Sequence, residues 1–364
     1  MQGVLCPILD LHGNVDKRAG GMDTLAITSI FTKSYAYAVR SQLSQIQKNL
    51  AAFNPFEKVF YIYVTDEARP DLAEYGKELM PAVEFINLVG DYKEAQNYKP
   101  DAQKMIARMM AAAFNKAVAL GVDYVWNVES DVLPQFNNLR SLYGTLAFDD
   151  GYYSIAFCPY ISQGKGGLLG GFGDHNHWIL PDVYEDEREI PAELIKELKE
   201  HREKQPKDKK PSDEWIKEMQ RIEEEVKKCP PNGNIFARQS KGFRRRGWGQ
   251  DAMPQSARGM IWEVDWIGTG NVLLNKKALH ATDFIGYERA GGTQDLFLCF
   301  RKWKASGLRI ACIPHSPCHH VTRHEFKEGD KVISPYTTIV LYHEEVDPNC
   351  KGHLRHREEP FYEF

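Results

Sequence analysis

The chain has 364 residues, with 46 Lys and Arg against 50 Asp and Glu, which gives a formal net charge of −4 at pH 7. With 43% apolar and 26% charged residues, the composition excludes a disordered, collagen-like or coiled-coil chain, and the charge excludes a uniformly basic protein. The length exceeds the roughly 250–300 residues at which a single core stops growing, so we expect one large domain with an insertion, or two domains.

The ends, apolar runs and cysteines of the sequence predict a cytoplasmic protein, in the host cytoplasm if its source is viral. The N-terminal segment lacks a basic stretch followed by a sustained apolar run, so we expect no secretory signal. No run of 18 apolar residues that could span a membrane occurs in the sequence. The seven cysteines are scattered and form no CxxC pair, which is typical of reduced thiols.

Strands and helices alternate in the first third of the chain. Apolar and β-branched runs predict strands at Leu25–Phe31, Lys58–Thr65 and Val122–Val128. We expect one helix from a Ser34 cap to about Leu50, and another from an Asp101 cap to Gly121. This rhythm predicts an α/β fold, with a mostly parallel sheet flanked by helices.

The middle of the chain is less regular, and the sheet pattern resumes after it. Gly164–Gly173 contains six glycines and reads as a loop, and the charged stretch 182–228 reads as an inserted pair of helices. The elements expected around these stretches are strands at Tyr152–Phe157, Met260–Asp265, Gly268–Leu274 and Leu308–Ile313, and a helix at Thr293–Ser306 that ends at Gly307.

Two carboxylates, Glu129 and Asp131, directly follow the strand that ends at Val128. Open α/β sheets bind ligands at the carboxyl ends of their parallel strands. Residues two apart in an extended segment point the same way, so both carboxylates can face one site. Oxygen donors of this kind suit Mg²⁺ or Mn²⁺ on a diphosphate, although a solvated surface loop remains the alternative.

A second acid, Asp295, follows the glycines Gly291 and Gly292 at the start of a helix. Thr293 at the N-cap places this carboxylate in the first turn, where the helix dipole favours its ionised form. Such a group can act as a general base toward a hydroxyl, and the alternative is a carboxylate that merely complements the dipole.

Histidines gather after the strand Leu308–Ile313 and could bind a metal. One of them could complete a site begun by Asp131, or they could pack a loop. A separate zinc site is the third alternative, although the spacing matches no standard zinc pattern. Its ligands would come from His315, Cys318, His319, His320 and His324.

Three segments in this order resemble the GT-A class of nucleotide-sugar glycosyltransferases, family-2-like: YVWNVESDV, WIGTGNVLLNKKAL and GGTQDLFLCFRKWKASGLRIACIPHSPCHHV. The resemblance implies a Rossmann-like domain whose nucleotide-sugar half is 1–181 and whose acceptor half is 260–325. Residues 182–259 would then form a charged helical insertion, and residues 326–364 a C-terminal extension. It also implies a metal-dependent, inverting transfer from a nucleoside diphosphate sugar, with a UDP-sugar as the favoured donor and Mn²⁺ or Mg²⁺ as cofactor.

The resemblance also assigns roles to individual residues. Asp131 would bind the metal together with His319 or His320, and Asp295 would be the catalytic base. Glu129 would contact the ribose or a metal-bound water, and Gln294 departs from the Glu of the family's Glu-Asp pair. Donor contacts are expected from Thr28, Ser29, Asp66, Lys104 and Arg108. The acceptor side is expected to include Gly268, Thr269 and Gly270.

The acceptor is the least determined part of the prediction. Six cations and a single acid occupy 238–258, and the aromatic Trp248 stands beside Arg244, Arg245 and Arg246. Arginines next to aromatics suit a phosphate backbone with stacked bases, so a 5-hydroxymethylpyrimidine in DNA is one acceptor and a saccharide the other. A sugar-phosphate nucleotidyltransferase and a non-catalytic protein that binds nucleic acid or zinc remain as alternatives. The first of these normally has a glycine-rich phosphate loop, and Phe31–Ser34 contains no glycine.

Overall fold

The structure is a computed structural model, and its chain divides into two compact units that are described separately. Residues 1–173, 246–289 and 293–364 form the sheet unit, and residues 174–245 with 290–292 form the helical unit. The residues that the structure describes are 23–92, 100–148, 151–160, 170–171, 191–203, 212–228, 261–287, 293–345 and 352–363.

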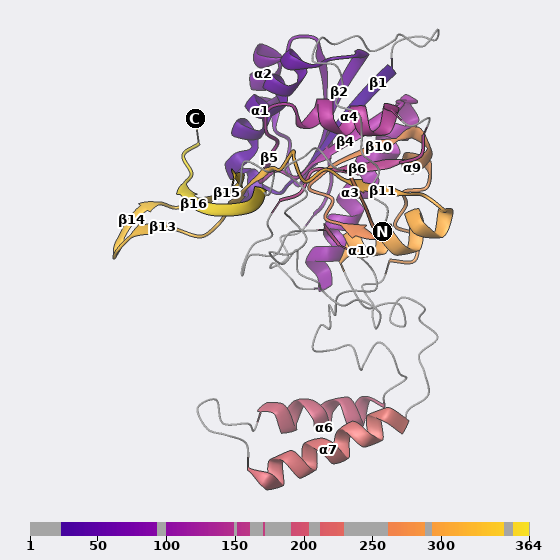
Figure 1. Cartoon of the computed structure of the whole chain (residues 1–364), viewed down its shortest axis with the longest axis vertical. Helices are drawn as coiled ribbons and strands as arrows, with labels where there is room; N and C mark the ends of the chain where they lie inside the picture. Colours follow the sequence, from indigo (N-terminus) through magenta and orange to yellow (C-terminus); the bar gives the residue numbers. More distant parts are fainter. Residues whose placement is uncertain are drawn as a thin grey trace. The chain divides into compact units, whose positions relative to one another are not determined.

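The sheet unit is built on an eight-stranded sheet that is mostly parallel, as predicted (Figure 1). Its strands, in the order in which they pair, are β3 (Val83–Val89), β2 (Phe56–Thr65), β1 (Asp23–Ile30), β4 (Tyr124–Val128), β10 (Asn271–Asn275), β6 (Ile155–Phe157), β11 (Ile310–Cys312) and β8 (Trp262–Val264). Strands β10 and β8 run antiparallel to their neighbours, and the other pairs are parallel.

Strand order reverses between β1 and β4. The chain steps outward from β1 to β2 and β3 and then returns to pair β4 with the free side of β1. Because crossovers between parallel strands are right-handed, the helices of the outward steps and of the return step cover opposite faces. The outward helices are α1 (Val39–Ala52) and α2 (Pro70–Leu79), and the return helix is α3 (Pro100–Leu120). In open α/β sheets, a reversal of this kind marks the place where ligands bind, which here is at the carboxyl ends of β1 and β4.

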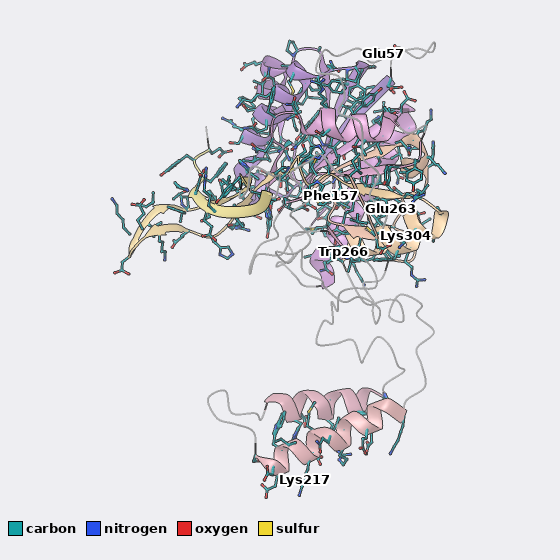
Figure 2. All side chains as sticks on the ribbon, viewed as in Figure 1. Glu57, Phe157, Lys217, Glu263, Trp266 and Lys304 are labelled. Atoms are coloured by element: carbon teal, nitrogen blue, oxygen red, sulfur yellow. The ribbon has the colours of Figure 1, made fainter. Side chains whose placement is uncertain are left out.

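The remaining helices complete the two faces. Helix α4 (Asn138–Phe148) packs beside α1, while α9 (Lys276–His280) and α10 (Gln294–Phe297) pack against α3. Between these layers most of the buried side chains of the sheet are apolar, and Phe157 of β6, labelled in Figure 2, has no exposed surface. The parallel strands therefore form the core that holds the carboxyl edge in place.

A second sheet, which was not predicted, follows β11. Its four strands are, in pairing order, β16 (Gly352–Pro360), β15 (Thr337–Glu345), β12 (His319–Thr322) and β5 (Val132–Leu133). Strand β5 begins directly after Asp131, so this sheet ties the histidine segment to the acidic turn. Two short two-stranded ribbons complete the unit: β13 (Phe326–Glu328) with β14 (Lys331–Ser334), and β7 (Gly170–Gly171) with β9 (Trp266–Ile267).

Several predicted boundaries are wrong. Ser34 does not cap α1, because a 3₁₀ helix over Lys33–Ala38 comes first and α1 begins at Val39. Asp101 lies inside the first turn of α3, which begins at Pro100. The helix predicted up to Gly307 is α10 continued by π and 3₁₀ turns, and Gly307 ends it as expected with φ of 70°. Strand β3 and helices α2 and α4 were not predicted.

The helical unit contains the two charged helices expected within 182–228. They are α6 (Ala192–Glu203) and α7 (Asp213–Lys228). Ile222 of α7 is fully buried, and the rings of His201 and Trp215 stack at a centroid distance of 4.9 Å, so the two helices share a small core. Among the described residues of the whole chain, no helix combines the length and the apolarity that a membrane crossing requires.

Candidate active site at the carboxyl edge of the sheet

The acidic turn that follows β4 lies at the strand-order reversal. The amide of Val132 donates to the carbonyl of Glu129 at 3.0 Å, which closes a tight turn around Ser130. The carbonyl of Asp131 accepts from the amide of Val321 in β12 at 2.8 Å. The turn is therefore held from both sides, by its own backbone and by the second sheet, and its two carboxylates lie at the edge where α/β sheets bind ligands.

The buried side-chain amide of Gln42, in α1, also binds the backbone of this turn. Its Nε2 donates to the carbonyl of Val128 at 3.2 Å and to that of Glu129, and its Oε1 accepts from the Tyr61 hydroxyl at 3.1 Å. The side chain has no exposed surface. Because a buried amide that satisfies several partners has one orientation, Gln42 fixes the backbone that carries Glu129.

Asp295 reaches this turn from α10, at the opposite side of the site. Thr293 occupies the N-cap position, as predicted, so Asp295 stands in the first turn of the helix. The Thr269 hydroxyl donates to Asp295 Oδ1 at 2.5 Å. The next residue of that loop, Gly270, accepts from the amide of Glu129 at 2.9 Å. The loop Gly268–Gly270 between β9 and β10 thus connects the acidic turn to Asp295.

Tyr160 is a buried link between three parts of the site. Its hydroxyl accepts from the amide of Gly270 at 3.0 Å and donates to Glu129 Oε2 at 3.4 Å. Its ring meets that of His320 edge to face at a centroid distance of 5.5 Å. A side chain at position 270 would place its Cβ 2.3 Å from the Tyr160 hydroxyl, so only glycine fits there.

The carboxylates of the site lie close enough to affect one another. Burial raises the pKa of Glu129 well above its ordinary value, and the charges of Asp295 and Asp131 raise it further. Burial also raises the pKa of Asp295 to about 6, although the hydrogen bond from Thr269 opposes this shift. Acids that repel each other in a common site are typical of a place that binds a cation or moves a proton.

Of the two predicted histidines, only His320 lies beside Asp131. Its Nε2 is 3.5 Å from Asp131 Oδ2, and 6% of its side chain is exposed. Of the two alternatives, His320 is thus the one on the side of Asp131, because successive residues of β12 point to opposite faces of the sheet. Burial lowers the pKa of His319 to about 4, and its charged neighbours are Glu359 and Arg357 on β16.

Tyr37 completes the surroundings of Asp131. Its hydroxyl lies 3.5 Å from Asp131 Oδ2 and donates to the carbonyl of Val321 at 3.3 Å. Within the described residues, no group of three His, Cys, Asp or Glu side chains is close enough to hold a metal. Within the same described residues, Asp131 and His320 are the pair that could hold a metal there, and the alternative of a separate zinc site gains no support from them. Cys318 instead accepts from Asn271 Nδ2 at 2.6 Å.

The predicted donor residues fall into two groups. Thr28 and Ser29 are fully buried in β1, where they donate to Asn127 Oδ1 at 2.9 Å and to Gln42 Oε1 at 3.5 Å. Both side chains therefore bond within the core behind the site, and their role as donor contacts stays a prediction.

The other group keeps access to solvent. Asp66 follows β2 and accepts from the amide of Lys33 at 3.0 Å, so it lies on the same carboxyl edge as the acidic turn. Lys104 and Arg108 are exposed on α3. Within the described part of the chain, neither forms a hydrogen bond or an ion pair with a residue of the site.

Four of the residues predicted on the acceptor side belong to the segment 229–260. Arg244, Arg245, Arg246 and Trp248 lie outside the described residues, as does the glycine-rich loop except for Gly170–Gly171.

Sequence reasoning missed Gln42, Tyr37 and Tyr160. A signal existed for Gln42, because it precedes Leu43 and lies near Ile46 on the apolar face of its helix, where a polar residue needs partners. Tyr160 offers no such signal, since its partners Glu129 and Gly270 are 31 and 110 residues away in the chain.

Comparison with known proteins identifies no family. Neither a protein-family model nor a curated protein matches the chain. Among solved structures, A197 from STIV is 10% identical, with 94% of this chain and 98% of that chain covered at a TM-score of 0.37. The mannosyltransferase Ktr4p from S. cerevisiae is 11% identical, with 83% of this chain and 68% of that chain covered at a TM-score of 0.37. Core-mannan synthase A from Aspergillus fumigatus, in its Mn/GDP form, is 9% identical, with 79% and 70% covered at 0.35. At these TM-scores the likeness assigns no chemistry, and the function is argued from the site.

Proposed function

We propose that the protein is a metal-dependent glycosyltransferase that moves a sugar from a nucleoside diphosphate sugar to an acceptor hydroxyl. The observation that carries this proposal is the convergence of Glu129, Asp131 and Asp295 at the strand-order reversal between β1 and β4, with His320 beside Asp131. Acids at this place in an α/β sheet suit a ligand whose phosphates are bound through a cation.

The donor set at Asp131 fits a divalent cation. The carboxylate oxygen and the imidazole nitrogen of His320 lie side by side, 3.5 Å apart, and the side chain of Asp131 is 13% exposed. Mg²⁺ in such sites is held by one or two carboxylates together with substrate phosphates, so few protein ligands are needed. A nitrogen ligand favours Mn²⁺ over Mg²⁺. A bound cation would supply positive charge against the diphosphate that leaves in the reaction.

The donor is expected to lie along the carboxyl ends of β1, β2 and β4. Asp66 at the end of β2 is available for the base, and Glu129 for the ribose or a metal-bound water. In this proposal the diphosphate binds at Asp131 and the sugar lies toward Asp295. A UDP-sugar is the favoured donor.

Asp295 is the general base in this proposal. Its Oδ1 accepts from the Thr269 hydroxyl, and in this proposal the carboxylate accepts the proton of the acceptor hydroxyl through its remaining lone pairs. With a pKa of about 6, the carboxylate is ionised at pH 7.5 and still basic enough to take a proton. The acceptor oxygen attacks the anomeric carbon as its proton passes to Asp295, and the bond to the diphosphate breaks. A single displacement of this kind inverts the anomeric carbon.

The test is a panel of UDP- and GDP-linked sugars incubated with Mn²⁺, scored by release of the nucleoside diphosphate. Acceptors are 5-hydroxymethylcytosine DNA, unmodified DNA of the same sequence, and simple saccharides. We expect release with at least one donor, stimulated by one acceptor class and abolished by EDTA. Stimulation by hydroxymethylated DNA alone would identify the DNA acceptor, and stimulation by a saccharide would exclude it. The configuration of the product, read by NMR, tests inversion.

The outcome that would refute the proposal is equally direct. If no donor releases nucleotide, or if release is unchanged in Asp131→Ala, the protein is not a metal-dependent transferase. Formation of pyrophosphate from a nucleoside triphosphate and a sugar phosphate would instead identify a nucleotidyltransferase.

A further inference from the structure

The proposed site is acidic, and its substrate is an anion. Within the described residues, burial raises the pKa of both Glu129 and Asp295, and the charges of Asp295 and Asp131 raise that of Glu129 further. What opposes these shifts is hydrogen bonding, from Tyr160 and Thr269 to Glu129 and from Thr269 to Asp295. A diphosphate brought next to these carboxylates adds further negative charge. A single divalent cation cannot balance all of it, so a protein cation is expected close to Asp131.

Arg323 is a cation in that position. It comes three residues after His320, just past the end of β12, and its side chain is exposed. Its guanidinium carbon lies 4.8 Å from the centroid of the Tyr35 ring. Its charge also reaches the neighbouring Tyr37. Burial and the charge of Asp131 raise the pKa of that hydroxyl, and Arg323 opposes them. Since the Tyr37 hydroxyl is 3.5 Å from Asp131 Oδ2, Arg323 stands near the proposed metal ligand.

The aromatic surroundings orient the guanidinium. Tyr35 belongs to the 3₁₀ helix that follows β1 and is half-buried, so Arg323 rests on the segment that borders the strand-order reversal. Tyr37 in turn stacks on Tyr336 at a centroid distance of 4.6 Å and an angle of 8°. A guanidinium held over a ring has lost part of its conformational freedom already, while its N–H edge stays free to donate to oxygen atoms.

From this placement we propose that Arg323 binds the diphosphate of the donor, which is the role that the sequence suggested for Lys104 or Arg108. The inference rests on the proposed function, because it concerns the substrate of the same site. Arginine suits the task, since its planar fork donates two parallel hydrogen bonds to phosphate oxygens. The residue could not be recognised in the sequence, because it follows a strand, β12, that was not predicted.

The experiment compares nucleotide binding with metal binding. UDP and GDP are titrated by calorimetry in the presence of Mn²⁺, and Mn²⁺ alone is titrated by electron paramagnetic resonance. For Arg323→Gln we expect about 10- to 100-fold weaker binding of the nucleoside diphosphate, as expected for a lost charge-assisted hydrogen bond. The affinity of Arg323→Lys for the nucleoside diphosphate should lie between those of the unmodified protein and Arg323→Gln. Affinity for Mn²⁺ without nucleotide should not change, because Arg323 is not a metal ligand.

Arg357 offers a matched control in the same sheet. It is also exposed and also lies over a tyrosine ring, 5.2 Å from the centroid of Tyr342. Arg357→Gln should bind nucleotide as the unmodified protein does. If Arg323→Gln binds UDP and GDP undiminished, or if Arg357→Gln is weakened equally, the inference is wrong while the proposed function stands. If the unmodified protein binds neither nucleotide, the proposed function fails and the inference with it.

Discussion

Two acidic clusters of this protein differ in how their charge is balanced. In the helical unit, Arg221 of α7 pairs with Glu197, with Glu218 at 2.8 Å and with Glu225 at 2.7 Å, all on an exposed surface. The neighbouring Lys217 is labelled in Figure 2. In the sheet unit, Glu129, Asp131 and Asp295 converge at a partly buried edge, where burial and then the charges of the two other acids raise the pKa of Glu129. A cluster that neutralises itself needs no ligand, whereas an uncompensated one is stable only at a cost that a ligand relieves.

The largest effect is expected from Asp131→Ala. Removal of this carboxylate leaves His320 as the remaining protein ligand, so the charge that balances the leaving diphosphate is lost. We expect nucleotide release to fall by more than about 10³-fold, in line with the several kcal/mol that a metal contributes to such a step. The assay is Mn²⁺-dependent release from the best donor of the panel. The matched variant Glu218→Gln removes an acid of the balanced cluster and should keep full activity, and an equal loss in both would contradict the comparison.

Asp295→Asn should lower the rate of transfer by about 10²- to 10⁴-fold, the usual contribution of a general base. The substitution keeps the shape of the side chain and still accepts the hydrogen bond from Thr269. Nucleotide affinity should therefore stay within about twofold by calorimetry. A parallel loss of binding and rate would show that Asp295 holds the donor instead of taking a proton.

The pH profile of transfer should show one acidic limb. The pKa of Asp295 is raised to about 6, so its carboxylate is protonated and inactive below that pH. We expect kcat to fall about tenfold for each pH unit below 6 and to be level between pH 7 and 8. The measurement is kcat at saturating donor and Mn²⁺. In Asp295→Asn the residual rate should not follow this limb, and an unchanged limb would assign it to another group.

Asp295→Asn should raise the stability of the protein, although it lowers the rate of transfer. Because the pKa of Asp295 is higher in the folded protein than its ordinary value of 3.8, its ionised form disfavours folding. This cost is absent below pH 3.8, develops as the pH rises to 6, and is complete at pH 8. Asp295→Asn should therefore raise the free energy of unfolding of the metal-free protein by about 1–2 kcal/mol at pH 8, read from denaturant unfolding. A lower free energy of unfolding in Asp295→Asn would mean that the hydrogen bonds of the ionised carboxylate outweigh the cost of its burial.

The smallest change is expected in the stability of a variant of the helical unit, where Arg221 balances the charges of Glu197, Glu218 and Glu225. Arg221→Gln removes a cation from an exposed network, where solvent and salt screen the lost pairs. The unfolding midpoint should change little, and less at high salt than at low salt. A sharp fall in the unfolding midpoint would show that these exposed ion pairs contribute more to stability than the comparison assumes.

How far the sequence led can be seen at Asp131 and His320. The acidic turn was predictable because it follows an apolar strand, and its place at the sheet edge depends only on the alternation of strands and helices. The choice between His319 and His320 was not predictable, because it depends on the register of β12 against β5 and β15. Both pairings join segments far apart in the sequence, and no local pattern marks them.

The same reason explains the other differences. Thr28 and Ser29 follow the strand pattern correctly, but which strand covers them is a property of the sheet order. Arg323 gains its place from Tyr35, which is nearly three hundred residues away. The short-range features of the sequence therefore predicted elements and single acids, while the assembly of the site came from pairings between distant strands.

The central claim is that the uncompensated acids bind a divalent cation, and a titration of the purified protein with Mn²⁺ tests it most directly. In the presence of UDP or GDP, electron paramagnetic resonance should detect one bound, exchangeable Mn²⁺ per chain. Asp131→Ala should abolish this binding, and Glu218→Gln should leave it intact. Absence of bound Mn²⁺ in the unmodified protein, or equal binding in Asp131→Ala, would contradict the account.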